Sequence, residues 1–161
     1  MTLINTADMN ISGYLGAYYS LGALLTTVLS LILGVFVLLK GYKERLKIYW
    51  FFTAFSVSNW SFFEYLWSVS KDYHSALIFV RIASLFVILL NISFILFTEE
   101  FIKKPNRVIS KIGSIVGSLI FIFGIIFPEL FIPSLVPRTF FKMYEDIGII
   151  YVFFTLFFIL A

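Results

Sequence analysis

Residues 16–39 read GAYYSLGALLTTVLSLILGVFVLL, and this stretch decides the fold class because it contains no charged residue. As an α-helix its length would be about 36 Å at 1.5 Å per residue. The hydrocarbon core of a bilayer is roughly 30 Å thick, and an uncharged apolar run of this length is typical of a membrane-spanning helix. The stretch therefore predicts a first transmembrane helix.

Four more apolar segments follow, separated by short polar breaks. They cover approximately residues 48–70, 77–98, 112–132 and 147–161. The last would be only about 22 Å long. It ends among apolar residues, where a spanning helix would leave backbone carbonyls unpaired in lipid, so it is expected to be truncated. The sequence predicts an all-α, polytopic transmembrane bundle of about five helices, forming one domain over residues 1–161.

The composition agrees with this prediction. Hydrophobic residues make up 61% of the chain and charged residues 13%, against roughly 45–50% and 25% in soluble proteins. The chain has no cysteine and one histidine, which excludes disulfides, thiolate ligands and a multi-histidine metal site. No cofactor is expected. The expected partner is the lipid bilayer rather than a nucleic acid, because the basic residues form short clusters between apolar runs.

The distribution of basic residues predicts the orientation. Lysine and arginine concentrate in the first loop (Lys40, Lys43, Arg45, Lys47) and the third loop (Lys103, Lys104, Arg107, Lys111). The second loop has only Lys71, and the fourth has Arg138 and Lys142. Loops rich in lysine and arginine stay in the cytoplasm. We therefore expect a multi-pass protein of the cell (inner) membrane with an extracytoplasmic N-terminus.

The fourth connection is longer than the others and contains prolines. Pro128 should disturb the last turns of the fourth helix, because proline lacks the amide hydrogen that a helix interior needs. The stretch that follows mixes charged and aromatic residues. It is interpreted as an interfacial or re-entrant segment on the outer face.

Two charged residues lie inside apolar segments. Glu64 would lie roughly 9 Å below the outer end of the second helix, and Arg81 roughly 6 Å below the outer end of the third. Only a short loop joins these helices, so both charges come to a similar depth on neighbouring helices. An unpaired charge at a helix centre costs about 2.5–3.5 kcal/mol, which predicts an ion pair. A structural pin between the helices is the preferred interpretation, and a gate or ligand anchor is the alternative.

Polar and aromatic stripes accompany these charges. The second helix carries Trp60, Glu64 and Trp67 at helical spacing, and the third carries Arg81, Ser84, Asn91 and Thr98 within an arc of about 100°. Such stripes are expected to face other helices or a cavity. The candidate ligand-binding or gating residues are Glu64, Arg81, Trp60, Trp67 and Asn91. Ordinary packing between helices explains the same pattern.

Close approach of helices is indicated by Gly113 and Gly117 in the fourth segment, which form a GxxxG motif. This motif serves packing within one chain at least as well as formation of a homodimer. The sequence contains no phosphate-binding glycine loop, paired catalytic carboxylates, nucleophile elbow or metal-ligand spacing. No catalytic residue, no metal site and no enzymatic activity are therefore expected.

Residues 28–102 resemble the N-terminal seven-helix membrane region of bacterial sensor histidine kinases and related receptors. The resemblance consists of an apolar helix ending in the basic loop KGYKERLK (40–47), then Asn59-Trp60-Ser61 and Glu64-Tyr65-Leu66-Trp67, and a third helix opening with Phe79-Val80-Arg81. In that family this region is a sensory input module with an outside N-terminus, followed by a cytoplasmic output domain. The chain would hold about four and a half of the seven helices.

The function expected from this resemblance is sensory input for a bacterial two-component or related signalling receptor. A small-molecule or lipid-like signal would enter at the outer loops or between the second and third helices. It would leave as a helix shift toward the missing output domain. The alternative is a transporter or channel subunit, or a fragment of one. Transporters usually carry midplane polar sites and internal repeats, whereas here the two charges lie near one surface.

Overall fold

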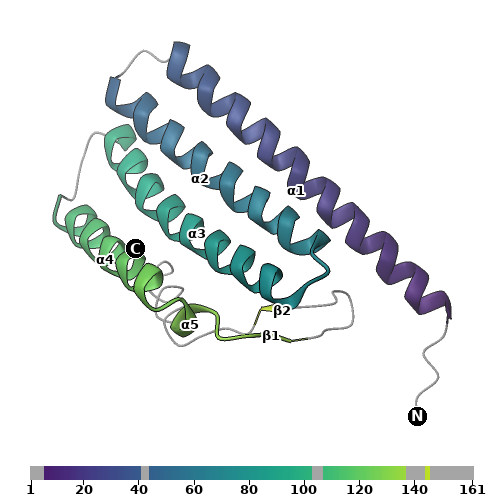
Figure 1. The fold of residues 1–161 in the computed structure, drawn as a ribbon. Helices are drawn as coiled ribbons and strands as arrows, with labels where there is room; N and C mark the ends of the chain where they lie inside the picture. Colours follow the sequence, from purple (N-terminus) through teal and green to yellow (C-terminus); the bar gives the residue numbers. More distant parts are fainter. Residues whose placement is uncertain (1–5, 41–43, 103–106, 137–143, 146–161) are drawn as a thin grey trace.

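Four long helices lie side by side in one layer in the computed structural model (Figure 1). The structure describes residues 6–40, 44–102, 107–136 and 144–145, and the side chains of residues 16–40, 44–102 and 112–135. The long helices are α1 (Thr6–Lys40), α2 (Glu44–Val69), α3 (Tyr73–Ile102) and α4 (Arg107–Ile126). Consecutive helices run antiparallel, and each packs mainly against its neighbours in the chain, as short connections favour.

The all-α architecture predicted from the sequence is confirmed, with one large difference in helix bounds. α1 begins at Thr6 instead of near Gly16, since no proline interrupts residues 6–16 and a helix can continue through polar residues. α2 and α3 also extend a few residues beyond the predicted apolar segments. The predicted fifth helix, residues 147–161, lies outside the described residues.

The fourth predicted helix is divided at Pro128. α4 ends at Ile126, and the one-turn helix α5 (Pro128–Phe131) follows it instead of a continuous helix to residue 132. Strand β1 (Leu135–Val136) comes next and pairs antiparallel with β2 (Tyr144–Glu145). The chain after α4 thus folds back beneath the start of α3 (Figure 1).

The interface between α1 and α2 is built from small residues. From residue 16 to residue 34, the residues of α1 turned toward the bundle are small and recur every three or four positions: Gly16, Ser20, Ala23, Thr27, Ser30 and Gly34. Val37 and Leu38 continue this side at the helix end. A Cβ atom added to Gly34 would lie 2.8 Å from the Cβ of Ala54 on α2, so the two backbones approach closely. Small side chains permit this approach.

The side chains of α2 have the reverse of the burial expected in water. Its buried residues are mostly small or hydroxylated: Thr53, Ala54, Ser56, Ser58 and Ser61, with Trp67 as the large exception. Its exposed residues include Phe52, Phe62 and Val69. Soluble proteins usually bury large apolar side chains and expose serine and threonine.

Among the described side chains, the buried apolar core lies around the first half of α3. Val80 and Ile88 are buried there together with Trp67 of α2 and with Phe131, Ile132 and Leu135, which follow α4. α4 also packs closely on α3, because a Cβ atom added to Gly117 would lie 2.7 Å from Cγ1 of Ile92. One glycine of the predicted GxxxG motif therefore serves packing within the chain.

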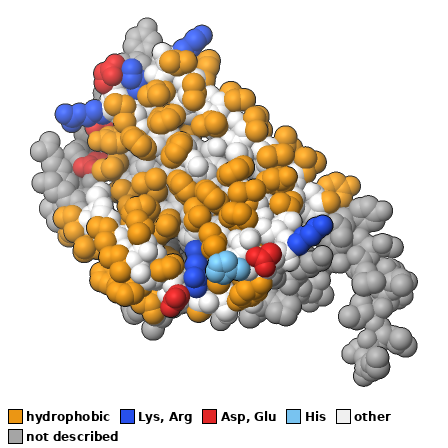
Figure 2. Space-filling view, in the orientation of Figure 1, with side chains coloured by type: hydrophobic (Ala, Val, Ile, Leu, Met, Phe, Trp, Pro, Cys, Tyr) orange, Lys and Arg blue, Asp and Glu red, His pale blue; other side chains and the backbone are white. Residues whose placement is uncertain are grey.

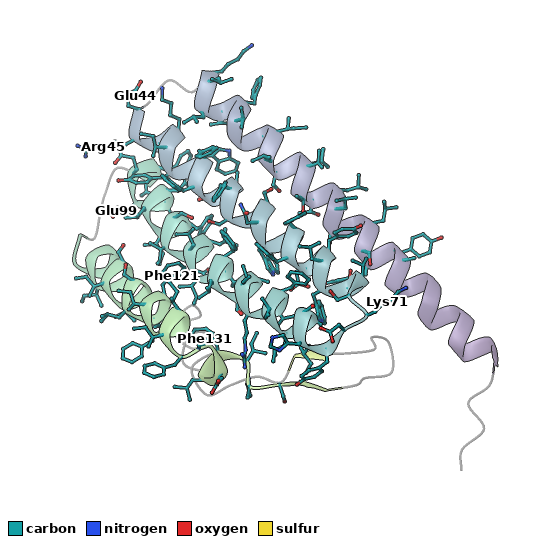
Figure 3. The ribbon with its side chains drawn as sticks, viewed as in Figure 1. Glu44, Arg45, Lys71, Glu99, Phe121 and Phe131 are labelled. Carbon is teal, nitrogen blue, oxygen red and sulfur yellow. The ribbon has the colours of Figure 1, made fainter. Side chains whose placement is uncertain are left out.

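Large apolar side chains cover the middle of the molecule, and charged side chains gather at its two ends (Figure 2). Glu44, Arg45 and Glu99 lie at one end of the helices and Lys71 at the other (Figure 3). Two helical stretches, Gly16–Lys40 and Tyr73–Ile102, are long and apolar enough to cross a membrane, and a shorter apolar stretch covers Ile112–Ile126. α2 falls short of this criterion.

Candidate functional site

Glu64 lies in the interface between α1 and α2, close to the end where α2 meets α3. Its carboxylate accepts hydrogen bonds from the hydroxyl of Tyr19 and from Nε1 of Trp60, the latter at 3.2 Å. The ring of Tyr19 packs edge-on against Trp67, with 6.3 Å between ring centroids. One carboxylate thus contacts two aromatic side chains from two helices, and a third aromatic side chain packs on one of them. Sequence reasoning selected Glu64, Trp60 and Trp67, and the structure brings them together.

The predicted ion pair between Glu64 and Arg81 is wrong. Nε of Arg81 donates a hydrogen bond to the backbone carbonyl of Ile132 at 3.0 Å. Within the described part of the chain, the one salt bridge joins Lys47 and Glu44 at 2.9 Å. Depth alone misled the prediction, since Glu64 faces α1 whereas Arg81 faces the segment after α5.

Arg81 and Tyr73 hold the segment after α5 against α3. Besides the bond from Arg81, the backbone amide of Leu135 donates to the hydroxyl of Tyr73 at 3.2 Å. Phe131 and Ile132 are buried beside them. Arg81 therefore satisfies a carbonyl at the end of α5 that no helix turn can satisfy, which is a structural role.

Asn91 is buried, but it does not link two helices. Its Nδ2 donates to the carbonyl of Val87 one turn earlier in α3, at 2.9 Å. Ser84 and Thr98 donate to carbonyls of the preceding turn in the same way. Apart from Arg81, the residues of the predicted polar stripe thus donate to carbonyls of their own helix, and the structure does not bring Asn91 together with Glu64.

Hydrogen bonds that side chains make from one helix to another concentrate, among the described residues, between α1 and α2. Ser20 and Ser68 share one at 2.8 Å, and the hydroxyl of Ser58 donates to the carbonyl of Thr27 at 2.8 Å. The sequence analysis missed Tyr19 and Ser20 because its candidate residues came only from the second and third helices. The recurrence of small residues along α1 was the signal that could have identified this interface.

Trp50 does not present its indole N–H outward, as an interfacial anchor would. Its ring packs against Phe97 of α3, with 5.2 Å between ring centroids. Nε1 of Trp50 is buried without a hydrogen-bond partner, and so is the hydroxyl of Ser114 on α4. Most buried polar groups are satisfied in folded proteins, so these two atoms are exceptions in the half of the bundle away from Glu64.

Asp72 caps the N-terminus of α3. Its carboxylate accepts hydrogen bonds from the backbone amide and the hydroxyl of Ser75, both at 2.9 Å. The bond from the Ser75 amide, followed by the bond from its hydroxyl, lowers the pKa of Asp72 below its ordinary value of 3.8. A cap of this kind satisfies an amide that has no partner in the first helical turn.

Replacing Asp72 by alanine is expected to lower the thermal stability of the chain by a small amount at neutral pH. Because folding lowers the pKa of Asp72, its stabilising effect is fully present above pH 3.8 and is lost as the pH falls through the folded-state value below that. Melting of both proteins in dodecyl maltoside should show a constant difference above about pH 4 and a shrinking one below it. Asparagine at this position keeps a capping oxygen. The D72N protein should therefore not show the lower melting temperature expected of the alanine variant at neutral pH. A difference that disappears by pH 6 would contradict this assignment.

Across the described residues, no group of three or more histidine, cysteine, aspartate or glutamate side chains could hold a metal ion. The fold and the site define a layered helical bundle with two helices long enough to cross a membrane and one aromatic-lined carboxylate. A comparison of the chain with protein-family models, with curated proteins and with solved structures finds no match.

Proposed function

We propose that this chain is a module embedded in the inner membrane of a bacterium, where it serves as the sensory input part of a signalling receptor without catalytic activity of its own. The N-terminus would lie outside, and the basic loops at the other end of α2 would lie in the cytoplasm. The signal would act near Glu64 and pass to a cytoplasmic output domain as a shift between helices.

The observation that carries the membrane assignment is the pattern of burial. Leu29, near the middle of α1, is 64% exposed, whereas Ser56 of α2 is fully buried. An extended apolar surface between two charged ends matches the solvent that a bilayer provides. Lipid also allows small residues to occupy helix interfaces, because burying leucine offers no gain when the surroundings are already apolar.

Two further features support a sensory role over transport. Apart from Glu64 and Arg81, the charged side chains described between residues 16 and 135 lie near the helix ends, so no charged site occupies the midplane. The α1–α2 interface is made of small residues and a few hydrogen bonds, which allows small displacements of one helix along the other. The resemblance to receptor input regions points the same way.

The orientation is tested by labelling single cysteines in this cysteine-free chain. Arg45 and Lys71 lie at opposite ends of α2 (Figure 3). An impermeant maleimide should label K71C in intact cells and should label R45C only after the membrane is opened. Labelling of R45C alone in intact cells would reverse the orientation, and labelling of both would remove α2 from the membrane.

The sensory role is tested against the channel or transporter alternative with the purified chain in liposomes. The buried hydroxyls of α2 and α3 mostly donate to backbone carbonyls, so they do not line a continuous water path. Efflux of K⁺ and of protons should therefore match that of protein-free liposomes, with gramicidin as the positive control. A flux that rises in proportion to the amount of protein would favour a channel or transporter.

A further inference from the structure

We infer that the carboxylate of Glu64, together with the aromatic rings of Tyr19 and Trp60, binds an organic ammonium ion. This inference rests on the membrane placement proposed above and names the class of ligand that this site would accept.

The carboxylate of Glu64 has no cationic partner among the described residues. Both groups that contact its carboxylate, the Tyr19 hydroxyl and the Trp60 indole N–H, are neutral donors. No lysine, arginine or histidine among the described residues forms a salt bridge with it. A carboxylate inside an apolar segment normally has a cationic partner. A bound cation would supply the partner that Glu64 lacks here.

The groups that contact Glu64 suit an organic cation better than an inorganic one. An inorganic cation needs several oxygen ligands, but the groups that contact Glu64 are an N–H and an O–H already donating to it. The faces of tryptophan and tyrosine rings instead attract cations with an apolar body, and such rings recognise quaternary ammonium groups. A carboxylate in contact with the side chains of Tyr19 and Trp60 therefore suits an alkylammonium ion better than a metal ion.

Part of this site is accessible on the surface of the helix layer. Tyr19 is 37% exposed and Trp60 is 36% exposed, whereas Trp67 is buried and packs edge-on against Tyr19. The site is therefore open on the outward surface of the helix layer, within two turns of the outer end of α2. An ammonium ion could arrive as a free cationic amphiphile or as the headgroup of a lipid, since both present the same chemistry.

The test uses the full chain purified in dodecyl maltoside, which contains no ammonium group. Dodecyltrimethylammonium is titrated into the protein and followed by isothermal calorimetry, with dodecanol as the uncharged comparison. We expect saturable binding of the cation and none of dodecanol. Addition of phosphatidylethanolamine then distinguishes the sources: displacement of the probe identifies a lipid headgroup as the ligand, and no displacement identifies a free cation.

Three variants make the result specific to this site. E64Q should weaken binding at least tenfold, and W60L should weaken it several-fold. E100Q removes the same charge near the opposite end of the bundle and should bind like the original protein. Should E64Q fail to fold, E64D retains the charge but withdraws it from the rings, and it should also weaken binding.

Equal binding by E64Q and the original protein would overturn the inference, and so would equal weakening by E100Q or equal binding of dodecanol. The outcome is separable from that of the proposed function. A chain that has the expected orientation and does not conduct ions, yet shows no saturable binding, would remove only the ammonium site.

Discussion

Replacing Leu29 by arginine is expected to disfavour membrane insertion of α1 by about 3 kcal/mol, which is the difference between the two residues at the centre of a spanning helix. Leu29 is 64% exposed and lies close to the middle of the apolar stretch Gly16–Lys40. On a protein surface in water the same exchange would change stability by less than about 0.5 kcal/mol. The substitution therefore distinguishes lipid from water as the surroundings of α1.

The measurement is the fraction of chains inserted in a translocon-dependent assay. A background in which exposed leucines of α1 are changed to alanine until about half of the chains insert makes the assay sensitive to a change of this size. L39R is the matched control, because Leu39 is also highly exposed but stands beside Lys40 at the helix end. Near the interface an arginine can extend into water, so L39R should change insertion little. Equal effects of the two substitutions would contradict a membrane-spanning α1.

Replacing Gly34 by leucine is expected to lower the free energy of unfolding by about 1–3 kcal/mol, as overpacking in a well-packed interface does. The first added carbon would already lie 2.8 Å from the Cβ of Ala54, and that atom cannot move without its helix. α1 and α2 would have to separate, which would disturb the hydrogen bonds between them. Unfolding in mixed detergent micelles measures the loss.

Gly22 provides the matched control on the same helix, because a Cβ atom added there would meet nothing within 4 Å. G22L should therefore unfold at nearly the same detergent composition as the original protein. Changing Ala54 to glycine in the G34L background should recover part of the lost stability, since it removes the Cβ atom with which the new side chain would clash. A G34L protein as stable as G22L would show that α1 and α2 are not in the close contact described above.

The number, order and approximate bounds of the first four helices could be predicted from the apolar segments of the sequence. A run such as residues 77–98 can satisfy its backbone only as a helix if its solvent is lipid, and short polar breaks make consecutive helices antiparallel neighbours. The break at Pro128 was also predictable, because proline cannot donate the hydrogen bond that a continuous helix requires. The start of α1 at Thr6 was not, because hydropathy does not register a helix that continues through polar residues.

The candidate site was predicted in part. Glu64, Trp60 and Trp67 share one side of α2, and helical spacing was enough to group them. Their partner Tyr19 and the hydrogen bond from Arg81 to Ile132 depend on how each helix is rotated about its axis. That rotation is set by packing details such as the contact between Gly34 and Ala54, which depth along a helix does not reveal.

The central claim is that the outward apolar faces of these helices lie against lipid, and spin labels at single cysteines test it most directly. Labels at Leu25, Leu29 and Ile32 report on the outward face of α1, and labels at Arg45 and Lys71 report on the two ends of α2. In liposomes we predict that the three α1 labels collide with oxygen, which dissolves in lipid, and not with the water-soluble nickel complex NiEDDA. The labels at residues 45 and 71 should collide with NiEDDA. Strong collision of NiEDDA with the label at Leu29 would place that face in water and contradict the account.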